Sequence, residues 1–186
     1  MKQNTIYLLV GQRGAGKSHY ANRLKEQQPE LIPISRDEIL VRLFGSTSLC
    51  PYSGGHIHAC AEALREIEMA FSEDKGKKVL LDFWTGFSNE RQSLVRKLRQ
   101  LGAERIVALY FTTPLQLVEQ WFWSKPGIAR ISEMKTRNGE KGIAFYSDNA
   151  PLYDFQLFHK EGQKIDDDGF DEVIRIDPQG ELVVLT

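Results

Sequence analysis

Residues 11–18, GQRGAGKS, form a motif suited to binding phosphate. They have the spacing G-x-x-x-x-G-K-S and follow an apolar run at residues 6–10 directly. Glycines let the backbone curl so that its N–H groups face one concavity, at the positive end of the next helix. Lys17 would reach the β- and γ-phosphates of a nucleotide, and the Ser18 hydroxyl would hold Mg²⁺. The alternative is a glycine-rich turn without a ligand. The predicted nucleotide-binding residues are Gly11, Gln12, Arg13, Gly14, Ala15, Gly16, Lys17, Ser18 and His19.

Two acidic residues follow other apolar runs and would lie near this loop. Asp82 lies near the end of the run at residues 79–83, as expected of a buried parallel strand whose carboxyl end faces the phosphates, where it would hold Mg²⁺ with Ser18. Asp37 follows the run at residues 31–34 and is the candidate general base for an acceptor hydroxyl. The alternative for Asp82 is a carboxylate that caps the turn after a strand. The alternative for Asp37, and equally for Glu38, is an acidic residue that the helix dipole favours in the first turn of a helix.

A cationic segment at residues 123–150 has weak periodicity and predicts a mobile cover over the phosphates. Phosphoryl transfer spreads charge over the γ-oxygens, which a closing cation would stabilise. Arg130 and Arg137 rank first, because guanidinium groups make bidentate phosphate contacts, although a solvated charge run is equally compatible. The candidate cations are Lys125, Arg130, Lys135, Arg137 and Lys141. Trp121 and Trp123 either stack on adenine or pack in a core. The sequence contains neither N-K-x-D nor T-K-x-D, the patterns that read guanine, and this favours ATP over GTP as the nucleotide.

Strand-like and helix-like segments alternate along the chain. Strands are predicted at residues 6–10, 31–34, 79–83, 105–111, 173–176 and 182–185, and helices at 18–28, 35–44, 59–71, 89–101, from 114, and at 151–159. Ser35 is a predicted helix cap, and Gly45 a predicted stop. This order predicts an α/β fold with a doubly wound, mostly parallel five-stranded sheet flanked by helices, and with ligands at the strand carboxyl ends.

Composition limits the class of protein. At 186 residues, with 41% hydrophobic and 26% charged residues, the chain is expected to form one domain, residues 1–186, with a lid at about residues 124–150. The net charge of −1 argues against extended nucleic-acid binding but allows contact with a short oligonucleotide end. Two cysteines, no signal peptide and no membrane-length apolar run predict a cytoplasmic protein without membrane contact. The set Cys50, His56, His58 and Cys60 lacks the spacing of common zinc sites, so zinc is not favoured.

The phosphate loop, residues 35–38 (SRDE) and residues 79–82 (VLLD) together resemble the P-loop kinase family. This family includes polynucleotide 5′-hydroxyl kinases, zeta-toxin-like kinases and AAA-type ATP-binding small kinases, all with an α/β P-loop NTPase fold. The resemblance implies that Asp37 is the general base. It also implies a departure, because the arginine that follows this base by three residues in polynucleotide kinases is replaced by Leu40 here, and Arg42 is expected on another helical face.

The function predicted from these residues is phosphoryl transfer. Such an enzyme would depend on ATP and Mg²⁺ and would move the γ-phosphate to a hydroxyl of a small molecule, a nucleotide or an oligonucleotide end. Its catalytic residues would be Lys17, Asp37, Arg130 and Arg137, and its metal ligands Ser18 and Asp82. The alternative is an ATPase switch or binding module that is gated by nucleotide and forms no phosphorylated product. The acceptor itself is not identified by the sequence.

Overall fold

A computed structural model describes residues 3–47, 51, 54–73, 75–137, 140 and 142–185. Cys50 and Lys141 lie outside these described residues. The elements are β1 (Thr5–Val10), α1 (Lys17–Gln27), β2 (Leu31–Ser35), α2 (Arg36–Phe44), α3 (Gly55–Glu73), β3 (Lys78–Asp82), α4 (Ser88–Gln100), β4 (Arg105–Phe111), α5 (Leu115–Trp123), β5 (Ile128–Arg130), a 3-10 turn η1 (Ile131–Glu133), β6 (Ala144–Tyr146), α6 (Ala150–Gly162), a 3-10 turn η2 (Ile165–Asp167) and β7 (Glu172–Ile176).

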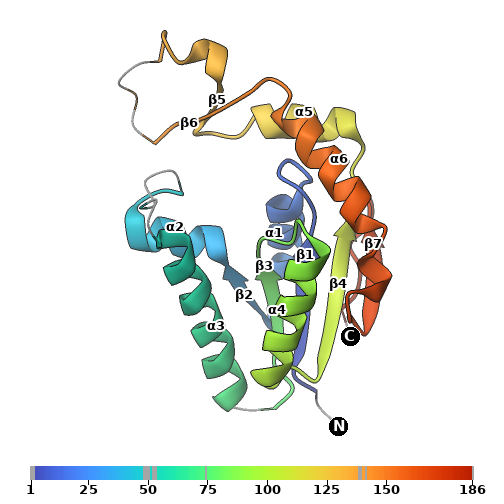
Figure 1. The fold of residues 1–186 in the computed structure, drawn as a ribbon. Coiled ribbons are helices and arrows are strands. Elements are labelled where there is room, and N and C mark those ends of the chain that lie inside the picture. The colour runs from blue at the N-terminus through green and yellow to red at the C-terminus, as the bar shows by residue number, and fades with distance from the viewer. Residues whose placement is uncertain are drawn as a thin grey trace.

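Five parallel strands form the main sheet, in the order β2-β3-β1-β4-β7 (Figure 1). The predicted doubly wound α/β fold is therefore confirmed. Strand β1 lies in the middle and is buried along its whole length. In the register, Asp82 of β3 lies beside Leu9 of β1 and Ser35 of β2, so the carboxyl ends of these strands meet at one edge. The phosphate loop leaves β1 at the same edge, which is where an open parallel sheet binds ligands.

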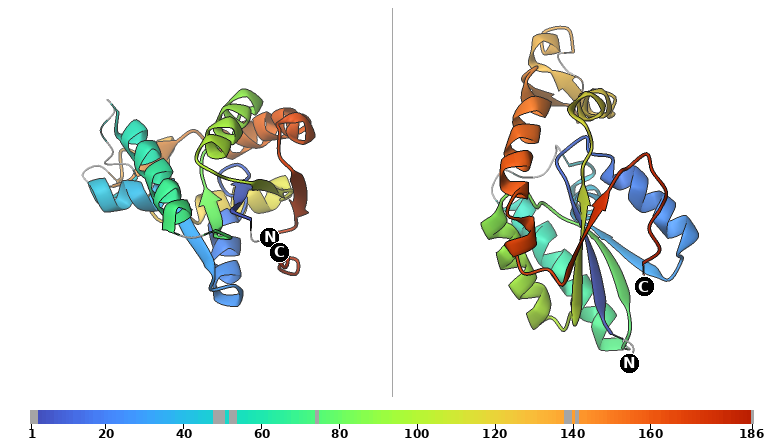
Figure 2. Two further views of the ribbon diagram at one scale, coloured as in Figure 1. Left: turned by 90° about the horizontal axis from the view of Figure 1, so that it is seen from below. Right: turned by 90° about the vertical axis from the view of Figure 1, so that its right-hand side faces the viewer.

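Helices cover both faces of the sheet (Figure 2). Helices α3, α4 and α6 lie on one face, and α1 lies on the other with the C-terminal segment. Side chains of β1 alternate between the two cores, because successive strand residues point to opposite faces. Ile6 and Leu8 pack in the core beneath α3 and α4, whereas Tyr7 and Leu9 pack with α1. Both faces of the sheet are therefore covered, whereas its carboxyl edge is open to a ligand.

The helix that carries Asp37 begins and ends as its sequence predicts. The Ser35 hydroxyl accepts a hydrogen bond from the Glu38 N–H at 3.3 Å, and Gly45 ends α2 in the left-handed conformation, at φ 84°. Side-chain capping satisfies a backbone donor that the first helical turn leaves unpaired. Asp37 is thereby held in the first turn of α2, directly after β2.

The predicted strand at residues 182–185 is wrong. This segment adds no strand to the sheet, because side chains of α1 and the residue after it provide its hydrogen-bond partners. The Tyr20 hydroxyl accepts from the Val183 N–H at 3.1 Å, and the Gln28 side chain bonds the Val183 carbonyl and the Leu185 N–H at 3.1 and 3.2 Å. Leu182, Val183 and Leu185 pack in the core that contains Tyr20 and Leu24 of α1.

The segment at residues 124–149 contains short regular structure that the sequence analysis missed. Strands β5 and β6 pair in parallel, with Ile128 beside Ala144 and Arg130 beside Tyr146. Strands of three residues are too short to show a period of two. Figure 1 shows this β5–β6 segment beyond the carboxyl edge of the main sheet, joined to it through α5 and α6. Among the helices described, none combines the length and the apolar character that a membrane crossing requires.

Candidate active site

Two glycines of the phosphate loop are required by conformation and by packing. Gly14 and Gly16 have φ angles of 79° and 86°, in the left-handed region that side chains disfavour. A Cβ at Gly14 would lie 2.5 Å from the Val118 carbonyl oxygen, and one at Gly16 would lie 2.8 Å from the Trp121 ring. Helix α5 therefore packs directly on the loop, and only glycine allows this approach.

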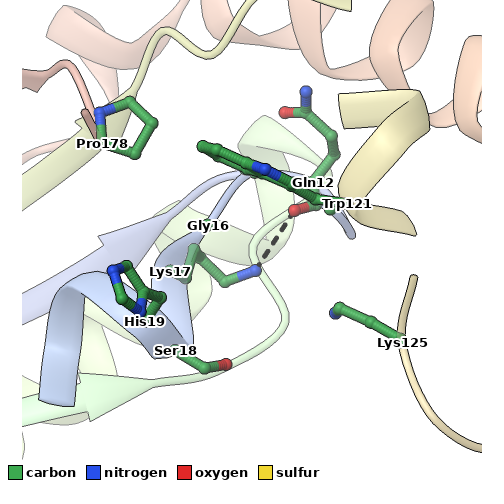
Figure 3. Close-up of a pocket in the computed structure, with 10 residues that line it drawn as sticks. Gln12, Gly16, Lys17, Ser18, His19, Trp121, Lys125 and Pro178 are labelled. Atoms are coloured by element: carbon green, nitrogen blue, oxygen red, sulfur yellow. Dashed lines mark hydrogen bonds between the residues drawn. The ribbon is translucent and has the colours of Figure 1, made fainter. Parts of the chain in front are cut away.

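The loop forms the floor of a cavity of about 350 Å³. Figure 3 shows the Trp121 ring above Gly16, the Pro178 ring beside it, and the Lys125 side chain directed toward the middle of the cavity. The lining residues are Gln12, Gly14, Ala15, Gly16, Lys17, Ser18, His19, Trp121, Lys125 and Pro178. The cavity thus combines backbone N–H groups and cations with a flat aromatic surface, a combination that suits a nucleotide.

The two candidate tryptophans have different environments. Trp121 lines this cavity, whereas Trp123 packs edge-on against Phe122 with ring centroids 4.8 Å apart. The Arg130 guanidinium also lies 4.1 Å from the Trp123 ring centroid. The sequence left two alternatives for these tryptophans, stacking on a base and packing against other side chains. Trp121 is placed where it could stack on a base, whereas Trp123 packs against other side chains.

The predicted base and metal ligands meet the loop lysine around a smaller polar cavity of about 60 Å³. We call it the transfer chamber; its lining residues are Gly11, Arg13, Lys17, Ser18, Arg36, Asp37, Asp82, Phe83, Trp84 and Lys125. The Lys17 ammonium donates to the Gly11 and Gln12 carbonyls at 2.9 and 3.3 Å, and the second bond is drawn in Figure 3. The Asp37 carboxylate accepts from the Arg36 guanidinium at 2.8 Å. Four cationic side chains therefore surround two carboxylates.

Ionisation in the transfer chamber reflects this crowding. Burial raises the pKa of Asp82, the nearby Lys17 ammonium opposes the rise, and Asp37 adds to it. The pKa of Lys125 is lowered, mainly because protein surrounds its ammonium and secondly because Lys17 repels it. Lys125 is exposed when the whole residue is considered, so its aliphatic stem faces solvent and its ammonium group is the part that the site encloses. An anion bound among these cations would relieve their repulsion.

The two arginines ranked first among the cover cations lie elsewhere. Arg130 pairs with Asp148 at 2.7 Å, and Arg137 pairs with Glu140 at 2.8 Å. Neither lines the nucleotide cavity or the transfer chamber as the described residues form them. Their catalytic role stays a prediction. The cations that do line the chamber beside Lys17 are Arg13, Arg36 and Lys125. Arg13 lies within the phosphate-loop motif and Arg36 directly precedes Asp37, so these two positions in the sequence could have indicated a place in the site.

Arg13 joins the phosphate loop to the elements above it. Its guanidinium makes two bonds to the Asp154 carboxylate of α6, at 2.7 and 3.0 Å. It also lies 4.7 Å from the ring centroid of Tyr146 in β6 and 5.6 Å from that of Phe122 in α5. Cation–π contacts and a bidentate ion pair favour one orientation of a side chain. The sequence motif places Arg13 in the loop but contains no signal for these distant partners.

Beyond Arg36 and Asp37, the described residues of α2 and α3 add no charged side chain to the lining of the chamber. Leu40, which replaces the arginine expected from the resemblance, is fully buried, and Arg42 bonds Glu66 at 2.5 Å. His56 and His58 are exposed on α3, and Cys60 is half-buried there. Because Cys50 lies outside the described residues, the four-residue zinc set is not described as a whole.

Comparisons with known proteins agree with this geometry. A family model of the AAA domain, AAA_33, matches residues 6–145. Among curated proteins, no sequence gives a match. Three similar solved structures are a chain of the Pnkp1/Rnl/Hen1 RNA repair complex (TM-score 0.66, 15% identity, 88% of this chain and 47% of that chain), shikimate kinase from Acinetobacter baumannii in complex with shikimate (0.55, 18%, 96% and 86%) and a fungal RNA kinase (0.53, 17%, 96% and 77%).

These comparisons establish the family and the fold. The chain spans about half the length of the RNA repair chain that it matches, 47%. At identities of 15–18%, the structural likeness concerns the fold. The predicted resemblance is confirmed at that level: the chain belongs to the AAA_33 family of AAA domains and has the fold of the P-loop kinases.

Proposed function

We propose that this protein is a kinase that depends on ATP and Mg²⁺ and transfers the γ-phosphate to an acceptor hydroxyl. The observation that carries the proposal is that Lys17 of the phosphate loop lines the transfer chamber together with the carboxylates of Asp37 and Asp82. Two of the similar structures are named as kinases, of shikimate and of RNA, which supports the same reaction class here. We further propose that residues 1–186 act as one cytoplasmic domain with the β5–β6 segment as its lid.

The cavity beside the chamber would bind the nucleotide. Backbone N–H groups of the loop and the start of α1 would hold the phosphates, and the base would stack against Trp121 near Pro178. Oxygen donors from Ser18 and Asp82 border the chamber together, a donor set that fits Mg²⁺. When bound there, Mg²⁺ would supply positive charge that neutralises the triphosphate.

The chamber's own residues account for the remaining chemistry. The acceptor oxygen forms a bond to the γ-phosphorus, its proton passes to the Asp37 carboxylate, and the bond from the γ-phosphorus to the leaving oxygen of ADP breaks. Arg36 orients Asp37 through its ion pair. Lys17 and Lys125 stabilise the charge on the transferring group. For Arg130 or Arg137 to share this role, the lid would have to move and their ion pairs with Asp148 and Glu140 would have to break.

The direct test follows labelled phosphate. The protein is incubated with γ-labelled ATP and a panel of 5′-hydroxyl oligonucleotides, nucleosides, nucleotide sugars and small alcohols, as the natural chain and as D37N. We expect one acceptor class to be labelled and D37N to lose transfer. D166N is the matched control, because Asp166 and Asp37 are both 62% exposed and each pairs with an arginine. If no acceptor is labelled and D37N leaves ATP turnover unchanged, the protein is not a kinase.

A second candidate function is a switch in which ATP orders the lid for a partner. The contacts of Arg13 with Asp154 and Tyr146 favour it, because they connect the phosphate loop to the lid. Self-association or partner capture that requires ATP, without a phosphorylated product, would support the switch over the kinase.

A further inference from the structure

A second large cavity, of about 380 Å³, opens beside the transfer chamber between α1, β2 and α2. We call it the α1–α2 groove. It shares Ser18, Asp37 and Asp82 with the chamber, whereas Ser18 alone among the described lining residues is common to the groove and the nucleotide cavity. The chamber therefore joins two cavities, one of which suits the nucleotide.

The sheet register explains why this groove exists. Pro33 of the edge strand β2 lies beside Leu80 of β3, and Ser35 lies beside Asp82. Leu9 and Leu80 are buried and form the apolar floor with Pro33, which is exposed because β2 is the last strand on this side. The groove thus runs from an apolar surface up to the carboxylates at the strand ends.

The charge of the groove differs in sign from that of the chamber. Among the described residues that line the groove, Asp37, Glu38 and Asp82 supply three carboxylates and Lys25 supplies one ammonium. The other cations of the site, Arg13, Lys17, Arg36 and Lys125, line the chamber and do not line the groove as the described residues form it. From the chamber side, Arg36 pairs with Asp37 at 2.8 Å and Lys17 lies near Asp82, so these two carboxylates are partly neutralised, and Glu38 and the bound nucleotide add the remaining negative charge. Bound Mg·ATP would add further negative charge. A phosphate-bearing molecule in the groove would consequently be repelled, and a cation or a neutral molecule would be accepted.

We propose that the α1–α2 groove binds the phosphate acceptor, and that this acceptor is an uncharged or cationic hydroxyl compound with an apolar face. The proposal rests on the proposed kinase function and narrows its substrate class. The hydroxyl would reach Asp37 at the inner end of the groove, the apolar face would cover Leu80 and Pro33, and polar groups would meet Asn22 and Lys25 of α1. Oligonucleotide ends, which carry phosphates beside the reacting hydroxyl, are disfavoured.

The charge of the groove is measurable without knowing the acceptor. Val41 lines the groove and Leu43 does not, although both are on α2 and nearly equally exposed, at 48% and 47%. V41C and L43C, each in a background carrying C50S and C60S, are reacted with cationic and anionic methanethiosulfonates of similar size. We expect the ratio of cationic to anionic rates to be roughly tenfold higher for V41C, and to fall as salt increases. Equal ratios, or a higher ratio for L43C, would overturn the proposal.

Use of the groove is tested by the same thiols. A bulky neutral adduct on V41C is expected to abolish transfer from γ-labelled ATP to the best acceptor, while calorimetry shows unchanged Mg·ATP binding. The same adduct on L43C should change neither, and the background variant should bind Mg·ATP like the natural chain. Transfer that survives the V41C adduct removes the groove as the acceptor site but leaves the kinase intact. Absence of any labelled acceptor for the natural chain instead refutes the kinase function itself.

A third comparison tests the substrate class. Each uncharged acceptor is paired with its phosphorylated analogue that retains the same free hydroxyl, for example a nucleoside with its 3′-phosphate. We expect kcat/KM to be at least tenfold higher for the uncharged member. A preference for the phosphorylated member would overturn the proposal while confirming that the protein is a kinase.

Discussion

A buried ion pair joins Arg91 of α4 to Asp168, the residue that follows η2. Both side chains are 0% exposed, and their Nε and Oδ2 atoms are 2.5 Å apart. Arg91 also donates to the Thr85 carbonyl at 2.9 Å and to the Glu161 carbonyl at 2.7 Å. The Ser88 hydroxyl donates to the same carboxylate. D168N would therefore leave a buried guanidinium without its compensating charge.

The expected cost follows from this burial. Removing one partner of a buried pair destabilises a protein by about 3–5 kcal/mol, because the remaining charge stays desolvated. For a domain of this size, each kcal/mol shifts Tm by about 2–4 °C, so D168N should lower Tm by roughly 6–20 °C. The control is D166N, which breaks the Arg175–Asp166 pair, with side chains 56% and 62% exposed. Exposed pairs contribute about 0–1 kcal/mol, so D166N should shift Tm by at most about 4 °C.

Thermal and urea unfolding, followed by circular dichroism, measure both variants. The apolar double variant R91M/D168L tests the cause, because it removes both charges and should recover much of the loss. If D168N lowers Tm no more than D166N does, or if the double variant is less stable than D168N, the explanation that D168N leaves a buried charge without a partner is wrong.

Four further predictions concern the site. K125A should lower kcat about 10²–10³-fold and R137A should change it little, because Lys125 lines the transfer chamber and Arg137 pairs with Glu140 instead; steady-state kinetics giving the reverse order would contradict this assignment. The Lys125 ammonium loses its charge as pH rises through its lowered pKa, so activity should decline at a lower alkaline pH than an ordinary lysine would cause, and K125R should move the decline upward. Conversely, Asp82 becomes protonated as pH falls through its raised pKa, so Mg²⁺ affinity, measured by titration in the presence of ATP, should weaken at a higher pH than for an ordinary aspartate; unchanged affinity across that range would exclude Asp82 as a ligand. W121A should weaken ATP binding by about 1–3 kcal/mol, or roughly 5–150-fold in Kd, and equal loss in a W123A control would count against base stacking.

Local patterns in the sequence determined much of this protein. The spacing of residues 11–18 after an apolar run predicts the phosphate loop, and the strand period with the Ser35 cap predicts Asp37 at the start of α2. The apolar runs at residues 79–83 and 105–111, which alternate with helix-like segments, predict the parallel sheet that the structure shows. These features were predictable because each depends on residues close together in the chain, where steric preference and hydrophobic period act directly.

Only the tertiary structure decided which charges reach the transfer chamber. Arg130 and Lys125 lie in one cationic segment, yet the first pairs with Asp148 and the second lines the chamber. Arg13 bonds Asp154 across 141 positions of sequence, and residues 182–185 find their hydrogen bonds on α1 instead of in a sheet. Such contacts depend on how whole elements pack, and several arrangements satisfy the same local pattern. The sequence therefore shows which cations are present, and the packing of α5, α6 and the β5–β6 segment determines which of them line the transfer chamber.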